Sequence, residues 1–170
     1  RLKANQKPSE KEVEKKKEVR RKRNQEADAR DARALAEAKQ QFDVFLSQKA
    51  GGAALALFKK FRKSGEGWRL DAPRLQALVA CLQAEKRWND LGPLLLELIE
   101  LSPERADGLR VSLAQLCVMK LERPGRALEL LSEANPAALN DKQRQVAAAV
   151  TQRAQQLQAD GIIEFDDDEW

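Results

Sequence analysis

The apolar residues of this chain recur at helical spacing through its middle. In residues 74–98, and again in residues 110–134, leucine, valine and alanine return every three or four positions, which places them on one face of a helix. Alanine, leucine, glutamate, lysine, arginine and glutamine dominate, tyrosine is absent, and the β-branched and aromatic residues that strands favour are few. The pattern predicts an all-α protein.

The two segments also match each other in their apolar pattern. A shift of 36 residues places Arg74 on Arg110 and superimposes apolar on apolar positions throughout. The matched pairs include Leu75 with Val111, Leu78 with Ala114, Cys81 with Cys117, Leu82 with Val118, Leu94 with Leu130 and Leu95 with Leu131. Each unit divides into two helices near its middle, so the repeat predicts stacked antiparallel helix pairs that share a core. Residues 51–61 are predicted to be the second helix of an earlier, degenerate unit.

Local chemistry predicts where these helices begin and end. Short polar side chains accept the free N–H groups of a helix start, and proline is tolerated in the first turn. The expected starts are Asp71 with Pro73, Asn89 or Asp90, Ser102 with Pro103, Arg123 with Pro124, and Asn140 or Asp141. The last helix should run to about Ala159, because Gly161 favours a helix end.

The N-terminal part lacks an apolar face over residues 10–33. Val13 and Val19 are the only sizeable apolar side chains there, so the stretch is either a solvated helix or partly disordered. Ser9 and Glu12 have the spacing of a capping box at its start. A narrow apolar stripe that should dock on the rest of the protein follows, formed by Ala38, Phe42, Phe45 and Leu46.

The net charge of +4 conceals two halves of opposite sign. Residues 1–63 hold 19 lysines and arginines against 9 acidic residues, whereas residues 64–170 hold 12 against 18. We therefore divide the chain into a basic arm over residues 1–41, a helical-repeat domain over residues 42–160 and an acidic tail over residues 161–170.

A dense basic cluster lies in the arm and consists of Lys15, Lys16, Lys17, Arg20, Arg21, Lys22 and Arg23. Such clusters attract the phosphate groups of anionic lipids or of nucleic acids. No aromatic residue is interleaved to stack on bases, which makes nucleic acid the less favoured partner. The remaining interpretation is a solvated spacer.

The composition argues against catalysis. Histidine is absent, which removes the usual general base, the commonest metal ligand and the Ser-His and Cys-His nucleophile arrangements. We expect no cofactor and no metal.

Cys81 and Cys117 lie in apolar helical stretches and are expected to be buried, reduced thiols. The carboxylates at 166–168 are expected to form a solvated acidic tip. No apolar run reaches the roughly 20 residues that a membrane-spanning helix needs.

The first unit resembles the tetratricopeptide repeat. Its first-helix positions are Leu75, Leu78 and Leu82, and its second helix has Trp88, Leu91, Leu95 and Leu98, with Pro103 as the closing proline. Val79 and Leu91 depart from the small residues usual in that family. The resemblance implies a concave surface lined by first helices, whose candidate binding residues are Gln76, Ala80, Gln83, Ser112, Leu116, Met119 and Lys120. The lysine, asparagine and arginine set that clamps a terminal carboxylate in some relatives is missing there.

A second resemblance covers residues 54–170. The matching stretches are residues 54–60, 68–70, 85–88, 102–106, 111–116, 123–128 and 168–170. Together they resemble the cytosolic C-terminal region of bacterial rhomboid-like membrane proteins, known mainly from planctomycetes. The resemblance implies a cytoplasmic domain tethered to the inner membrane through a segment preceding Arg1, with the arm as a juxtamembrane connector.

These observations favour a non-catalytic module that binds a protein or peptide. The alternative is a charge-driven adaptor whose basic arm binds anionic lipid or nucleic acid. An enzyme that uses the clustered carboxylates of the tail is the least favoured of the three hypotheses.

Overall fold

A computed structural model describes residues 10–63 and 68–164, and within these ranges the chain is helical and contains no strand. The prediction of an all-α protein is confirmed. The α-helices are α1 (Glu10–Ser47), α2 (Gly51–Lys63), α3 (Ala72–Ala84), α4 (Leu91–Leu101), α5 (Ala106–Met119), α6 (Pro124–Glu133) and α7 (Asp141–Ala159). Short 3₁₀ turns at Trp88–Asp90, Pro103–Arg105 and Pro136–Ala138 precede α4, α5 and α7.

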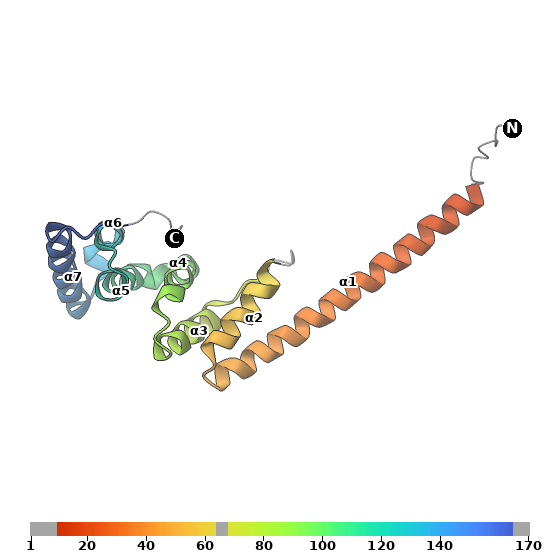
Figure 1. Cartoon of the computed structure of the whole chain (residues 1–170), viewed down its shortest axis with the longest axis horizontal. Helices are drawn as coiled ribbons and strands as arrows, with labels where there is room; N and C mark the ends of the chain where they lie inside the picture. Colours follow the sequence, from red (N-terminus) through yellow and green to blue (C-terminus); the bar gives the residue numbers. More distant parts are fainter. Residues whose placement is uncertain (1–9, 64–67, 165–170) are drawn as a thin grey trace.

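The helices pack in chain order. Each one contacts the next, and α5 also packs against α7. Figure 1 shows α1 as a rod of 38 residues that extends away from the other helices, with only its C-terminal part lying against them. Every described side chain from residue 11 to residue 34 is exposed, so this part of α1 has no contact with the body formed by α2–α7.

The same turn recurs after every odd-numbered helix. The left-handed residues of these turns are Lys49 (φ 57°), Lys86 (φ 57°), Glu122 (φ 53°) and Gly161 (φ 80°). After α1, α3 and α7 a backbone N–H donates to the carbonyl five residues earlier, as in the Schellman motif that ends many helices. After α5 the bond spans six residues, from the Arg123 N–H to the Cys117 carbonyl (2.9 Å).

A second recurring feature marks the start of α3, α5 and α7. Each of these helices has an aspartate at or near its first residue and an arginine three residues later, and the two side chains form an ion pair. The pairs are Asp71–Arg74 (3.0 Å), Asp107–Arg110 (3.0 Å) and Asp141–Arg144. The Asp–Arg start therefore recurs at α7, which the apolar pattern had not indicated.

The local predictions of helix ends are mostly confirmed. Asp71 accepts the Arg74 N–H (3.0 Å) at the start of α3. Asn140 forms a capping box with Gln143 at the start of α7, which ends at Ala159 before the left-handed Gly161.

The predicted start at Asp90 is confirmed, since α4 begins at the next residue, but the expected side-chain cap is absent. The Asp90 side chain makes no capping bond, because it is engaged by two basic side chains that are described below. The predicted capping box of Ser9 and Glu12 lies outside the described side chains.

The core confirms that the end of α1 docks on the body. Ala38 and Phe42 are buried, and Phe45 and Leu46 pack partly buried against the same core. The Phe42 ring lies 5.4 Å from the Trp68 ring, which in turn lies 5.3 Å from the Phe58 ring of α2. The boundary drawn at residue 41 therefore falls inside one continuous helix.

The two cysteines occupy different environments. Cys117 is fully buried on α5, as predicted, whereas Cys81 on α3 is only partly buried. The prediction of burial is therefore wrong for Cys81. The cause is its position beside the loop that joins α1 to α2, where its Sγ lies 3.9 Å from the Leu46 carbonyl oxygen.

Candidate functional site: a groove between α2 and α4

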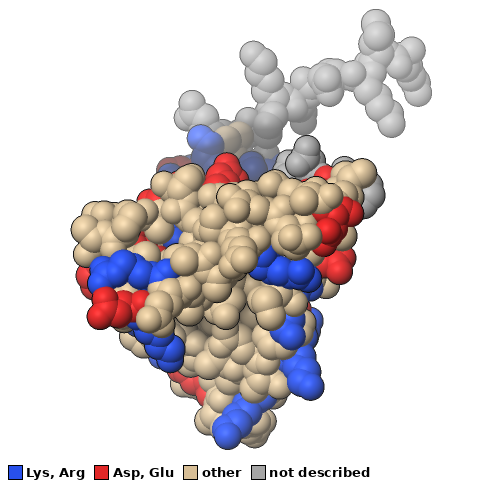
Figure 2. Space-filling view, turned by 90° about the vertical axis from the view of Figure 1, so that its left-hand side faces the viewer, with Lys and Arg blue, Asp and Glu red and all other residues tan. Residues whose placement is uncertain are grey.

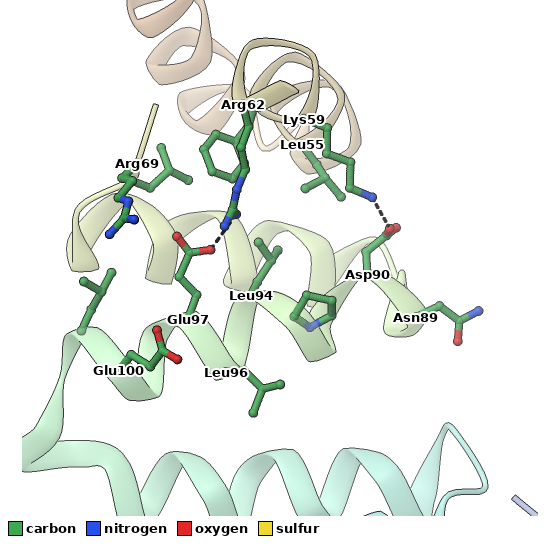
Figure 3. A pocket seen from close by; sticks show the side chains of 14 residues that line it. Leu55, Lys59, Arg62, Arg69, Asn89, Asp90, Leu94, Leu96, Glu97 and Glu100 are labelled. Atoms are coloured by element: carbon green, nitrogen blue, oxygen red, sulfur yellow. Dashed lines mark hydrogen bonds and ion pairs between the residues drawn. The ribbon is translucent and has the colours of Figure 1, made fainter. Parts of the chain in front are cut away.

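A groove of about 500 Å³ runs between α2 and α4 (Figure 3). Its floor is apolar and is formed by Leu55 and Phe58 of α2, Leu70 from the segment before α3, and Leu94 of α4. These four side chains are buried in the core. Leu101 lies at the rim and is 46% exposed, so one end of the groove offers apolar surface to a partner.

The walls of the groove carry opposite charges. On the α2 side, Lys59 pairs with Asp90 (Nζ to Oδ1, 3.3 Å) and Arg62 pairs with Glu97 of α4 (Nη1 to Oε2, 2.9 Å). Figure 3 shows both pairs crossing from one wall to the other. The Arg62 guanidinium also lies 5.5 Å from the centre of the Phe58 ring, which fixes its position over the apolar floor.

The groove exists because α3 supports both of its walls. α3 packs against α2 and against α4, and its Leu75, Leu78 and Leu82 are fully buried. The two even-numbered helices therefore lie side by side on α3, joined across their outer surface by the two ion pairs rather than by apolar packing. The gap between them remains open to solvent.

The two ends of the groove differ in charge. Figure 3 shows Arg69 and Glu100 at one end and Asn89 and Asp90 at the other. Neither Arg69 nor Glu100 forms an ion pair with a described residue, whereas Asp90 is shared between Lys59 and Arg87. One end thus presents an available cation and an available anion to a bound segment.

The face expected from the repeat lies elsewhere, on α3 and α5. Of its residues, Gln76, Ala80, Gln83, Ser112, Met119 and Lys120 are exposed and Leu116 is partly buried. The Gln76 amide oxygen accepts a bond from Arg105 (3.1 Å), and the Ser112 hydroxyl donates to the Gly108 carbonyl (3.0 Å). Met119, 62% exposed, is the largest apolar contribution. This face is more polar than the groove.

The basic cluster of the arm lies on the exposed part of α1. All seven of its lysines and arginines are exposed. Glu14 and Glu18 are four residues apart and therefore share one narrow strip of the helix, and Glu18 pairs with Lys22 (3.0 Å). The opposite side carries basic residues around Val19, which is 61% exposed.

Shifted pKa values lie outside the groove. A hydrogen bond from Arg74 holds the pKa of the Asp43 carboxyl below its usual value. Burial raises the pKa of the Cys117 thiol to about 11 and raises that of Cys81 as well. Among the described residues no group of three His, Cys, Asp or Glu side chains is arranged to hold a metal ion, and no helix is long and apolar enough to cross a membrane.

The end of the body that carries α6 and α7 is largely uncharged. Figure 2 shows a broad surface without lysine, arginine or acidic residues there, bordered by scattered charges. The exposed side of α7 consists mainly of alanine and glutamine. Charge-based recognition therefore concentrates on the groove and on α1.

Sequence reasoning missed the groove. A signal was present in the sequence: Lys59 and Arg62 lie three residues apart on α2, and Glu97 and Glu100 have the same spacing on α4.

No protein-family model, curated protein or solved structure matches this chain. The tetratricopeptide-like and rhomboid-like resemblances therefore stay predictions, and the function has to be argued from the residues themselves.

Proposed function

We propose that this chain is a non-catalytic protein-binding module of tetratricopeptide-like helix pairs, and that the α2–α4 groove receives a segment of a partner protein. The groove carries the proposal. Its volume of about 500 Å³ lies in the range of known binding sites, and an apolar floor with a few placed polar groups is their usual composition. An amphipathic helix fits this shape, because helix-in-groove recognition uses apolar anchors with charged flanks.

The recurring features of the odd-numbered helices support the repeat architecture. Their left-handed turns and their Asp–Arg starts mark successive units. Arg74 of α3 also pairs with Asp43 of α1 through two bonds of 2.8 and 2.9 Å, which ties neighbouring first helices together. Stacked units of this kind bury their faces only against each other and leave extended surfaces for partners.

The dimensions of the groove suit a short helix. α4 has 11 residues and, at a rise of about 1.5 Å per residue, spans roughly 16 Å. About three turns of a partner helix fit along it, with two or three aliphatic side chains directed at the floor. The surface formed by α3 and α5 is the competing site, and Met119 is its apolar centre.

A selection from displayed peptides tests the proposal. Random peptides of about 16 residues, long enough for four helical turns, are selected on the whole chain. The selected peptides are then measured on Leu101→Asp and Met119→Asp variants. Both positions are exposed, so both variants should keep the wild-type melting temperature. We expect Leu101→Asp to weaken binding about tenfold or more, because it places an unpaired charge on apolar contacts, and Met119→Asp to leave it unchanged. The reverse result would move the site to the α3–α5 face. A selection that yields no binding peptide would contradict the proposal of a protein-binding module.

The second candidate function is attachment to an anionic membrane surface through α1. The exposed basic cluster favours it, because the acidic residues Glu14 and Glu18 lie on one narrow strip of the helix and leave the other sides basic. If the rhomboid-like resemblance holds, a membrane-embedded part precedes Arg1 and this cluster lies just past the bilayer on the cytosolic side. Each base close to an anionic surface contributes about 1 kcal/mol, and the attraction decays over a Debye length of about 8 Å at physiological salt.

Vesicle sedimentation tests this second function. We expect weak binding to anionic vesicles at low salt and none to neutral ones. Replacing the seven bases of residues 15–23 by glutamine should abolish it without lowering the melting temperature. Binding that survives both the replacement and high salt would show that an apolar surface is responsible, and preferred binding to single-stranded nucleic acid would favour the other phosphate source.

A further inference from the structure

A second, smaller cleft of about 350 Å³ lies beside one end of the groove. Asn89 and Asp90 line both spaces, so the two are adjacent. The rest of the cleft is formed by Lys86, Arg87 and Trp88 from the loop before α4, and by Lys120 from the end of α5. A side chain at the end of a segment lying in the groove can therefore reach this cleft.

The cleft is positively charged. Arg87 and Asp90 neutralise each other through a pair at 2.9 Å. Lys86 and Lys120 are exposed and form no ion pair with a described acidic residue. The Lys120 ammonium lies 5.2 Å from the centre of the Trp88 ring, a cation–π contact that holds it against the wall. Two available ammonium groups thus border a half-buried aromatic ring.

The starts of two other even-numbered helices, α2 and α6, bind carboxylates. At the start of α2, Glu85 accepts the N–H groups of Gly51 (2.5 Å) and Gly52 (3.0 Å). At the start of α6, Glu164 accepts the N–H groups of Gly125 and Arg126. Glu85 follows α3, and Glu164 follows α7. In both places the carboxylate therefore comes from the segment that follows the next helix but not from that helix itself.

The start of α4 departs from this pattern. In the loop after α3, Glu85 directly precedes the left-handed Lys86. In the loop after α5, Leu121 directly precedes the left-handed Glu122. In the loop after α5, Leu121 therefore stands at the position that Glu85 has in the loop after α3. Within the described residues, no carboxylate from that loop reaches the start of α4.

From the two unpaired lysines, the aromatic wall and the position of the cleft beside the groove, we infer that the cleft binds an aspartate or glutamate side chain of the partner segment seated between α2 and α4. This inference rests on the proposed function and assigns the partner an acidic residue at the end of its apolar stretch. A single carboxylate suits the cleft, because the two lysines without an ion pair supply only a small number of positive charges and the third base, Arg87, is already paired with Asp90.

The test compares the wild-type chain with a Lys86→Glu, Lys120→Glu double variant. Both proteins are used to select from the same library of random peptides. Lys142→Glu, an exposed change of the same charge on α7, is the control, and thermal melting verifies that all three proteins are folded. We expect peptides from the wild type to combine aliphatic residues with an acid at one end. They should bind the double variant about tenfold more weakly and the control equally well, and the double variant should select basic residues at that end instead.

The outcomes separate the two proposals. Peptides that require Leu101 but show no acidic preference, or that bind the double variant equally well, would overturn the acidic specificity and leave the groove intact. Peptides that do not depend on Leu101 would overturn the groove and the inference with it. Tighter binding of a single-stranded oligonucleotide than of any acidic peptide, lost in the double variant, would reassign the cleft to phosphate and also overturn the inference.

Discussion

Replacing Phe42 by alanine should destabilise this protein more than any change on the rest of α1. The Phe42 side chain is fully buried, although it belongs to the helix whose first half is exposed. Its ring packs edge-on against Trp68 (5.4 Å between centres) and tilted against Phe58 (6.4 Å). Phenylalanine-to-alanine changes in cores cost about 3–5 kcal/mol, and this site loses two aromatic pairs. We expect about 4 kcal/mol of lost stability.

Urea unfolding followed by tryptophan fluorescence measures this loss as a lower transition midpoint at an unchanged slope. Val19→Ala on the exposed part of α1 is the matched control and should change the free energy of unfolding by less than about 0.5 kcal/mol. A loss below about 1 kcal/mol for Phe42→Ala would refute the reasoning, because it would show that the end of α1 is not part of the cooperative core.

Three further predictions concern single features of the body and of α1. Cys81 should react with a bulky thiol reagent well before Cys117. Burial raises the pKa of the Cys117 thiol from 9.0 to about 11, so the folded state favours the neutral thiol and the free energy of unfolding should fall as pH rises from about 9 through about 11. Cys117→Ala should remove that part of the fall in urea titrations. Glu164→Gln should lower stability by about 1 kcal/mol in thermal melts, because the bonds to the start of α6 lose their charge, whereas Glu122→Gln should not. Amides of residues 11–33 should exchange with solvent much faster than those of α3, and equal protection would show that this stretch is packed.

Helix ends that depend on nearby residues were predictable from the sequence. Asp71 and Asn140 act on backbone groups three residues ahead, so short-range chemistry determines them. The same reasoning failed at Asp90, because its carboxylate pairs with Arg87, three residues earlier, and with Lys59, 31 residues earlier in the chain. The pair with Arg87 could have been read from the sequence near Asp90, whereas the pair with Lys59 depends on the fold.

The groove was not predictable in the same way. It depends on α3 holding two helices apart at their outer surfaces, and the Arg62–Glu97 pair joins residues 35 positions apart. The apolar periodicity of α2 and α4 correctly placed Leu55 and Leu94 in the core. Periodicity alone does not show that a buried residue also forms the floor of an open groove.

Carboxylates from the segments that follow odd-numbered helices stabilise the starts of two even-numbered helices. A carboxylate from one loop fixes the start of α2, and Glu164 does the same for α6, so each of these contacts joins one unit to the next. Near the start of α4, the end of α5 supplies Lys120 instead of a carboxylate. The Lys120 ammonium lies over the face of the Trp88 ring. Among the described residues, this junction between α4 and α5 therefore lacks the loop carboxylate that the starts of α2 and α6 have. A carboxylate from a partner would complete it, so binding at the groove should stiffen the junction between α4 and α5 more than either of the others.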